Sequence, residues 1–252
     1  MTDPEIPTFW WFEAGQFGGM GRPGFNRCHW FDLPLEGGVL LTWIGEGAAA
    51  EGSFAGLDAH LDAYAPKVAP FFDLTEAQAR ARFDRLKEPA GLMAALEQLN
   101  VKMRVLRDLR EGPDGVVRYT LDTSQVRHDV AALQRLGISV LVSLMEIEPA
   151  AELRQAGLDL HHLPVGDVTP PTLDQVRAFG RILGDAQERG QRVVTHCLAG
   201  VGRTTTMYLA AALLNGRPWD ELTAHVARCN PRYQLRGPQV AFLRRLADEV
   251  GG

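Results

Sequence analysis

Hydrophobic and polar positions follow two different rhythms along this chain, and the change falls near residue 125. After that point, short runs of apolar residues alternate with amphipathic stretches. A continuous apolar run predicts a strand that is buried on both faces. Such a run occurs at 138–144, and two further strands are predicted at 158–165 and 191–196. This alternation is typical of an α/β domain with a mainly parallel central sheet flanked by helices.

Helices between these strands are predicted from apolar spacing and from capping residues. Thr172 and Gln175 have the spacing of a capping box, and apolar residues follow at helical intervals. Gly137 is a predicted C-cap, because glycine adopts the left-handed conformation there without steric cost. The other helices predicted after residue 125 cover 126–137, 150–157, 203–214, 218–229 and 237–249.

Most of the chain before residue 125 lacks this alternation and is predicted to form an α+β segment. The apolar run GGVLLTWI (37–44) predicts a strand, and Thr75 with Gln78 predicts a capped helix. VKMRVLRDLR (101–110) and VVRYTL (116–121) flank the turn sequence EGPDG, as the two strands of a β-hairpin do.

The first strand of this predicted hairpin is rich in basic residues. At a period of two, Lys102, Arg104 and Arg110 would share one face of the strand, with Asp108 among them. Such a basic patch could steer an anionic substrate toward a site, and a solvated strand face is the alternative interpretation.

Composition and charge exclude several classes of function. The chain has 252 residues with 46% hydrophobic content and a formal net charge of −5. No long charge run occurs, so neither nucleic acid nor a membrane surface is an expected partner. The N-terminus lacks a basic n-region and no apolar run approaches the roughly 18 residues that span a bilayer. We therefore expect a cytoplasmic protein.

Cysteine usage narrows the chemistry. The three cysteines, Cys28, Cys197 and Cys229, form no C-x-x-C pair, which argues against a disulfide framework and against a structural zinc site. We expect no metal and no cofactor. Cys28 and Cys229 are predicted to be structural, with an oxidative disulfide to Cys197 as the alternative.

Cys197 has a setting that favours an anionic sulfur. It follows a predicted strand and precedes a predicted helix, so its side chain would lie at the positive end of the helix dipole. Gly200 and Gly202 let successive backbone N–H groups converge on one point. Arg203 adds a planar fork that matches two phosphate oxygens. This pattern predicts a nucleophile at the base of a phosphate-binding loop.

The segment HCLAGVGRT resembles the H-C-x5-R-(S/T) loop of cysteine-based protein phosphatases of the protein tyrosine phosphatase superfamily. GDVTPP, which places Asp167 30 residues before Cys197, resembles the acid loop of the dual-specificity branch. The likeness also covers FWWFEAGQFGGMGRPG (9–24) and GISVLVSLMEIEP (137–149). It implies a dual-specificity-like α/β fold.

The resemblance also implies how the chain divides into domains. It covers about 8–24 and 125–245. A phosphatase domain is therefore expected to comprise 1–24 and 123–252, with 25–122 as an inserted α+β segment packed on it.

The same resemblance implies a role for each residue of the loop. Cys197 would attack phosphorus, Asp167 would protonate the leaving oxygen, and Thr204 would steady the sulfur as a leaving group. His196 would order the loop. The equatorial phosphate oxygens would be held by Arg203 and by the backbone of Leu198, Ala199, Gly200, Val201 and Gly202. Gln239 resembles a glutamine of the family's C-terminal helix, and no role is assigned to it.

The substrate stays open at this point. Phosphotyrosine, phosphoserine or phosphothreonine proteins and small phosphoesters are all compatible with the loop. Phosphatase-like phytases have a similar loop but typically carry an acidic residue at the position of Leu198. A phosphate-reading pseudophosphatase is disfavoured, because Cys197, Arg203 and Asp167 are all present.

Overall fold

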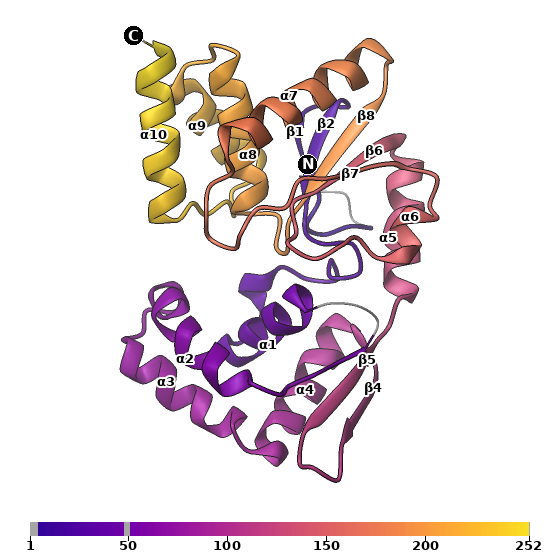
Figure 1. The fold of residues 1–252 in the computed structure, drawn as a ribbon, viewed down its shortest axis with the longest axis vertical. Coiled ribbons are helices and arrows are strands. Elements are labelled where there is room, and N and C mark those ends of the chain that lie inside the picture. The colour runs from indigo at the N-terminus through magenta and orange to yellow at the C-terminus, as the bar shows by residue number, and fades with distance from the viewer. Residues whose placement is uncertain (1–4, 48–50, 252) are drawn as a thin grey trace. The chain divides into compact units, whose positions relative to one another are not determined.

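The computed structural model describes residues 5–47 and 51–251, and the chain divides into two compact units (Figure 1). Unit 1 comprises Met1–Asn26 and Val126–Gly252, and unit 2 comprises Arg27–Gln125. Residues 1–4 of the predicted phosphatase domain lie outside the described residues.

Unit 1 is built on a mostly parallel sheet. Within the described residues it holds five strands in the order β1-β2-β8-β6-β7. Only β1 runs antiparallel to its neighbour, at one edge. The strands are β1 (Trp10–Glu13), β2 (Phe17–Met20), β6 (Ile138–Ser143), β7 (Asp159–His162) and β8 (Arg192–His196). The predicted α/β class and the three strands predicted after residue 125 are confirmed.

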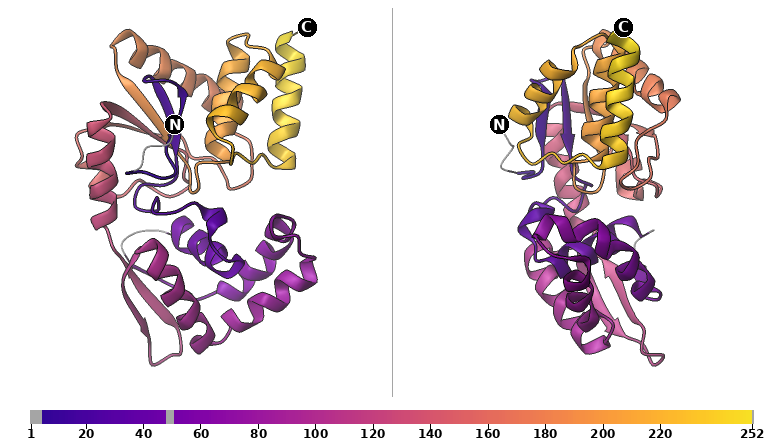
Figure 2. Two further views of the ribbon diagram at one scale, coloured as in Figure 1. Left: turned by 180° about the vertical axis from the view of Figure 1, so that it is seen from behind. Right: turned by 90° about the vertical axis from the view of Figure 1, so that its left-hand side faces the viewer.

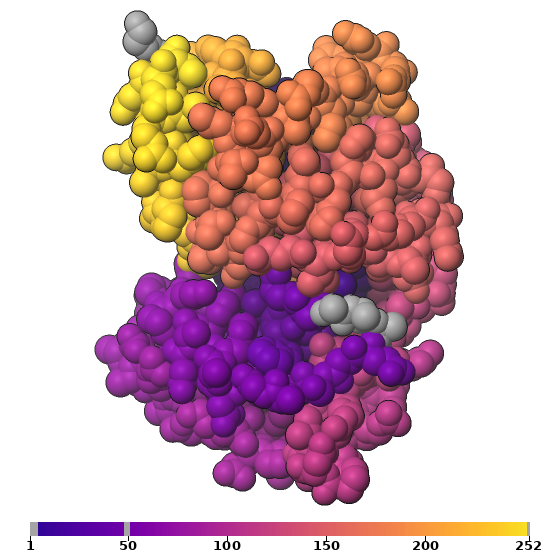
Figure 3. Space-filling model, viewed as in Figure 1, coloured from indigo at the N-terminus to yellow at the C-terminus, as the bar shows by residue number. Residues whose placement is uncertain are grey.

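Helices cover both faces of this sheet (Figures 1 and 2). They are α5 (Ser124–Arg135), α6 (Ala151–Arg154), α7 (Leu173–Glu188), α8 (Arg203–Leu214), α9 (Trp219–Cys229) and α10 (Gly237–Gly251). In the space-filling view, α7 and α10 form part of the surface of unit 1 (Figure 3). All of the helices predicted after residue 125 are confirmed, with ends shifted by a few residues at most sites.

The two faces of the sheet pack into two separate cores. Val140 and Val142 of β6 belong to the core that includes α7, α8 and α10, while Leu141 between them belongs to the core on the α5 side. Side chains alternate across a strand, so a strand buried on both faces must be apolar at every position. This explains the unbroken apolar runs in the sequence.

The predicted helix caps of unit 1 are also present. The Thr172 hydroxyl accepts a hydrogen bond from the Gln175 N–H at 3.2 Å, and Gln175 Oε1 accepts one from the Thr172 N–H at 2.8 Å. Gly137 follows α5 with a φ of +72°, as predicted for a C-cap.

Unit 2 combines helices with a small antiparallel sheet of strand order β3-β5-β4. The predicted capping box of Thr75 and Gln78 is confirmed at the start of α3. The elements of unit 2 are α1 (Leu35–Glu46), β3 (Glu51–Ser53), α2 (Leu57–Val68), α3 (Glu76–Phe83), α4 (Pro89–Met103), β4 (Leu106–Glu111) and β5 (Val117–Leu121).

The strand predicted at 37–44 is wrong, because these residues lie inside the helix α1. Val39, Leu40 and Ile44 are fully buried, and the Trp30 indole N–H donates to the Gly38 carbonyl at 2.9 Å. A helix that is buried all round needs apolar residues on every side, so its sequence looks like that of a buried strand.

The predicted basic strand face is also wrong. Lys102 lies in the last turn of α4, and Arg104 is its C-cap with a φ of +50°, so only Arg110 lies on β4. The Asn100 side chain makes two hydrogen bonds to the Leu106 backbone, at 2.8 and 2.9 Å, and thereby joins the helix end to the start of the strand. The three cations therefore share no strand face.

Adjacent glycines in α1 allow a test of its helical structure. Replacing Gly37 by alanine should raise the free energy of unfolding by about 1 kcal/mol, because alanine favours a helix interior over glycine. Its Cβ would lie 3.7 Å or more from Leu33, Pro34 and Leu99, which is ordinary contact.

Gly38→Ala is the matched variant and should lower the stability, since its Cβ would lie 2.9 Å from Trp30 Cζ2. Thermal and urea unfolding of both variants measure the two effects. Equal losses in both would argue against a helix at this position.

Candidate active site

The loop after β8 begins at the carboxyl edge of the parallel sheet. His196 ends β8, where it is paired with Met20 of β2 and Ser143 of β6, and Cys197 follows directly. Cys197 is only 3% exposed. Arg203 then begins α8, so the loop between them lies at the N-terminal end of that helix.

The carbonyl groups of this loop are held by neighbouring segments. The Arg22 N–H donates to the Leu198 carbonyl at 2.8 Å, and the Gln234 N–H donates to the Val201 carbonyl at 3.1 Å. The Gly200 carbonyl accepts from Trp10 Nε1 at 3.2 Å and from Asn230 Nδ2 at 3.3 Å, and the Gly202 carbonyl from the Thr206 N–H at 2.8 Å.

The backbone N–H groups of this loop, unlike its carbonyls, make no hydrogen bonds to neighbouring segments in the described part of the chain. Among the described residues, those of 198–202 have no protein acceptor. A loop whose carbonyls are held outside and whose N–H groups are free is a site for an anion.

Gly200 is needed for this loop to lie against β2. Its φ of +73° is in the left-handed region, and a Cβ at this position would lie 2.5 Å from the Met20 carbonyl carbon. No side chain fits there, so glycine is required both by conformation and by space.

Asp167 and Arg203 come together beside the loop. Arg203 is 3% exposed, and its Nη2 lies 3.6 Å from Asp167 Oδ1 while its Nη1 donates to the Val165 carbonyl at 3.3 Å. The Asp167 N–H donates to Glu146 Oε2 at 3.2 Å. The segment that follows β7 is therefore held between Arg203 and the residues after β6.

Gln239 joins the acid loop to the C-terminal part of the chain. It is 1% exposed, its Nε2 donates to the Thr169 carbonyl at 3.2 Å, and its Oε1 accepts from the Arg236 N–H at 2.9 Å. Val168, beside Asp167, has a φ of +57°, which is strained for a β-branched residue. These contacts hold the strained turn in place.

His196 and Thr204 lie buried on either side of the loop. Burial, above all, lowers the pKa of His196 to about 3, and the charges of Arg22, Arg203 and His162 lower it further. The imidazole is therefore neutral near pH 7, and its Nδ1 lies 3.4 Å from the Cys197 carbonyl oxygen. Within the described part of the chain, the Thr204 hydroxyl has no hydrogen-bond partner.

The structure adds contributors that the sequence analysis missed. Trp10 is in the core at 3% exposure, and its indole also binds the Gly200 carbonyl. Glu146 follows β6 at the same sheet edge as Cys197, and it holds the Asp167 backbone. The carboxyl ends of parallel strands meet at one edge, which is the signal that could have indicated Glu146.

All three cysteines are free thiols. Cys28 belongs to unit 2, where its Sγ is 3.1 Å from the Met103 sulfur. Cys229 is half-buried, and its Sγ is 3.4 Å from His225 Nε2.

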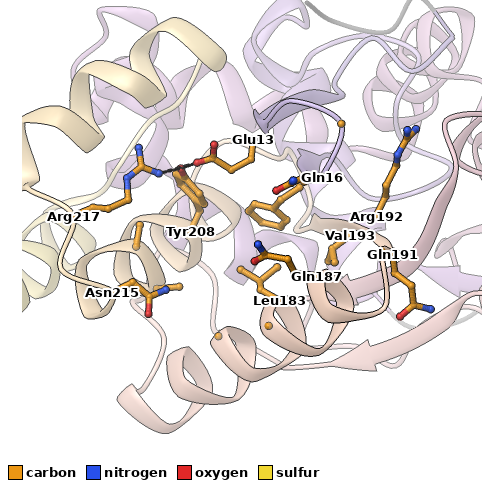
Figure 4. A pocket seen from close by; sticks show the side chains of 17 residues that line it. Glu13, Gln16, Leu183, Gln187, Gln191, Arg192, Val193, Tyr208, Asn215 and Arg217 are labelled. Atoms are coloured by element: carbon orange, nitrogen blue, oxygen red, sulfur yellow. Dashed lines mark hydrogen bonds and ion pairs between the residues drawn. The ribbon is translucent and has the colours of Figure 1, made fainter.

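A separate hollow of about 590 Å³ lies at the opposite end of the sheet (Figure 4). It is lined by Phe17 and Val193, which stand near the start of β2 and β8, and by Tyr208 in the middle of α8. The Tyr208 hydroxyl donates to Glu13 Oε1 at 2.6 Å, and Arg217 Nη1 donates to the same oxygen at 2.7 Å. This hollow is not part of the phosphate-binding loop.

Residues 5–47 and 51–251 contain neither a cluster of metal-ligating side chains nor a membrane-spanning helix. No group of three or more histidine, cysteine, aspartate or glutamate side chains is placed to hold a metal ion. No helix in these ranges has both the length and the apolar character needed to cross a membrane.

Part of the chain is similar to known phosphatases. Residues 115–217 match the family model described as "Tc-R-P: Polymorphic toxin system, DSP-PTPase phosphatase". The structure of Tk-PTP in its active form is 24% identical over 48% of this chain and 84% of its own, with a TM-score of 0.44. PTPMT1 is 21% identical over 47% of this chain and 82% of its own, with a TM-score of 0.41. The PTP-2 phosphatase of Cydia pomonella is 18% identical over 48% of this chain and 80% of its own, with a TM-score of 0.43. Residues 115–217 are therefore similar to a phosphatase domain of the dual-specificity type.

Proposed function

We propose that the chain hydrolyses phosphomonoesters, with phosphorylated proteins as its substrates, through a cysteinyl-phosphate intermediate on Cys197. The observation that carries the proposal is the position of Asp167, 3.6 Å from Arg203 at the edge of the loop that contains Cys197. A phosphate-binding cation and a carboxyl group that can serve as an acid thus lie side by side.

In the first step, the Cys197 thiolate attacks phosphorus in line with the departing oxygen. The S–P bond forms, the ester P–O bond breaks, and the Asp167 carboxyl group gives its proton to the leaving oxygen. The three equatorial oxygens are held by the Arg203 guanidinium and by the N–H groups of 198–202. The dephosphorylated alcohol or phenol then departs.

In the second step, the Asp167 carboxylate takes a proton from water, and the water oxygen attacks phosphorus. The S–P bond breaks, inorganic phosphate is released, and the Thr204 hydroxyl donates a hydrogen bond to the departing sulfur. The neutral His196 imidazole contacts the Cys197 carbonyl and thereby helps to order the loop. Every proton in this cycle is carried by the substrate, water or Asp167, so no metal is needed.

The biological setting is also part of the proposal. The description of the matched family names polymorphic toxin systems. We place the enzyme in the bacterial cytoplasm. Comparing the growth of bacteria that express the active chain with the growth of bacteria that express its Cys197→Ser variant would show whether dephosphorylation is toxic.

Loss of the nucleophile tests the reaction itself. The wild-type chain should hydrolyse p-nitrophenyl phosphate in the presence of a chelator, and Cys197→Ser should reduce turnover to background because serine is a far weaker nucleophile. Cys229→Ser is the matched control and should retain turnover, since the contacts of the Cys229 sulfur are His225 Nε2 and the Phe12 carbonyl, neither of which belongs to the loop. Retained turnover in Cys197→Ser would falsify the mechanism.

The leaving-group dependence tests the role of Asp167. Asp167→Asn should lower kcat on alkyl phosphates by about 10²-fold or more, the usual scale of general-acid catalysis. The loss should be smaller on aryl phosphates with good leaving groups, and the basic limb of the pH–rate profile should flatten. Asp174→Asn, at an exposed position on α7, is the control. If Asp167→Asn matches the wild type on alkyl phosphates, the acid is another residue.

A substrate panel separates phosphoproteins from inositol polyphosphates. The loop between Cys197 and Arg203 contains no basic residue, so it offers a single cation to a polyanion. Phosphotyrosine and phosphothreonine peptides should therefore be hydrolysed faster than inositol hexakisphosphate, as measured by phosphate release. The reverse order would favour a phytase-like activity.

A further inference from the structure

The turn that follows β2 contacts the phosphate-binding loop on its carbonyl side. The Arg22 N–H in this turn donates to the Leu198 carbonyl at 2.8 Å. A Cβ on Gly21 would lie 3.0 Å from the same carbonyl oxygen, and one on Gly200 would lie 2.7 Å from the Gly21 nitrogen. Almost no free space separates the loop from residues 20–22, so the position of the loop depends on the position of these residues.

This turn is tied to α5 by a carboxylate that is fully buried. Asp129 has 0% exposure, and its Oδ2 accepts hydrogen bonds from the Gly24 N–H at 2.7 Å and from Asn26 Nδ2 at 2.9 Å. Asn26 Nδ2 also donates to the Arg22 carbonyl at 2.9 Å. The chain of contacts thus runs from Asp129 through Asn26 to Arg22, and from Arg22 to the Leu198 carbonyl.

A second tie reaches the same turn from the N-terminal side. The Thr8 hydroxyl accepts from the Gly21 N–H at 3.1 Å and donates to Asn26 Oδ1. Thr8 and Asn26 are 4% and 1% exposed, so the network is buried throughout. Buried polar groups cost stability unless they are paired, and bonds to a charged acceptor are roughly twice as strong as neutral ones.

The network also spans the point where the chain leaves and re-enters unit 1. Asn26 is the last residue before unit 2, and α5 carries the chain back after it. Without the hydrogen bonds from Gly24 and Asn26 to Asp129, fewer contacts would hold the turn at 21–26 against α5. The support behind the Leu198 carbonyl would then be free to shift.

We propose that Asp129 is a positioning residue for the phosphate-binding loop. Its carboxylate fixes the turn at 21–26, the turn holds the Leu198 carbonyl away from the anion site, and the N–H groups of the loop consequently face that site. This inference rests on the proposed function, because it concerns the same loop. It predicts that a residue on α5 affects phosphate binding.

Binding of tungstate, a tetrahedral oxyanion, tests the proposal without requiring turnover. In a Cys197→Ser background, Asp129→Asn should weaken tungstate binding about tenfold or more, measured by titration calorimetry. The amide keeps the size of the carboxylate but replaces a charged acceptor by a neutral one, whose hydrogen bonds with the donors of Gly24 and Asn26 are roughly half as strong. In the active chain, kcat on p-nitrophenyl phosphate should fall by a similar factor.

Two further variants keep the test decisive. Asp185→Asn, at an exposed position on α7, is the matched control and should change neither binding nor kcat. Thr8→Val removes the second tie and should weaken tungstate binding in the same direction, so it decides the matter if Asp129→Asn does not fold.

The outcomes separate this inference from the proposed function. A folded Asp129→Asn with unchanged tungstate affinity and unchanged kcat overturns the positioning role, even if its melting temperature falls. Weaker tungstate binding in a chain that never turns over p-nitrophenyl phosphate supports the positioning role and removes the proposed activity. A Cys197→Ser parent that binds no tungstate removes both.

Discussion

The hydrogen bonds that hold the loop carbonyls outward are the constraint on which the candidate site depends. Donors from three segments, at Trp10, at Arg22 and at Asn230 and Gln234, bind the carbonyls of Leu198, Gly200 and Val201. These segments are far apart in sequence, so the loop adopts this conformation only when the sheet, the β1–β2 hairpin and the C-terminal helices are all assembled. Preorganised N–H groups need no rearrangement when charge develops on phosphate, which is the main source of catalysis in such loops.

The parallel sheet brings Asp167 to the same region as Cys197. β6, β7 and β8 end at one edge, so the segments that follow them carry Glu146, Asp167 and Cys197 to a common region. Glu146 holds the Asp167 backbone, and Gln239 holds the next turn through the Thr169 carbonyl. The acid loop is thus supported from the sheet on one side and from α10 on the other.

Local sequence patterns predicted the helices and strands of unit 1 well. They did not predict contacts between residues that are distant in the sequence. The capping box at Thr172 and the contiguous loop from Cys197 to Arg203 need only neighbouring residues, and a sequence shows these directly. No local pattern indicates that the Trp10 indole binds the Gly200 carbonyl. In unit 2, α1 was predicted as a strand because complete burial removes the periodicity that distinguishes the two structures.

Several buried side-chain polar atoms near Cys197 have no protein partner in the described part of the chain. In the described ranges they include Thr195 Oγ1, His196 Nε2, Thr204 Oγ1 and Thr205 Oγ1, all within ten residues of one another. Each such atom costs about 1–3 kcal/mol of stability. Apolar residues of similar size would avoid this cost, so packing alone does not account for the choice of residues. This region gives up stability beside a loop whose N–H groups also lack protein acceptors among the described residues, and that combination supports the proposal that the loop binds an anion.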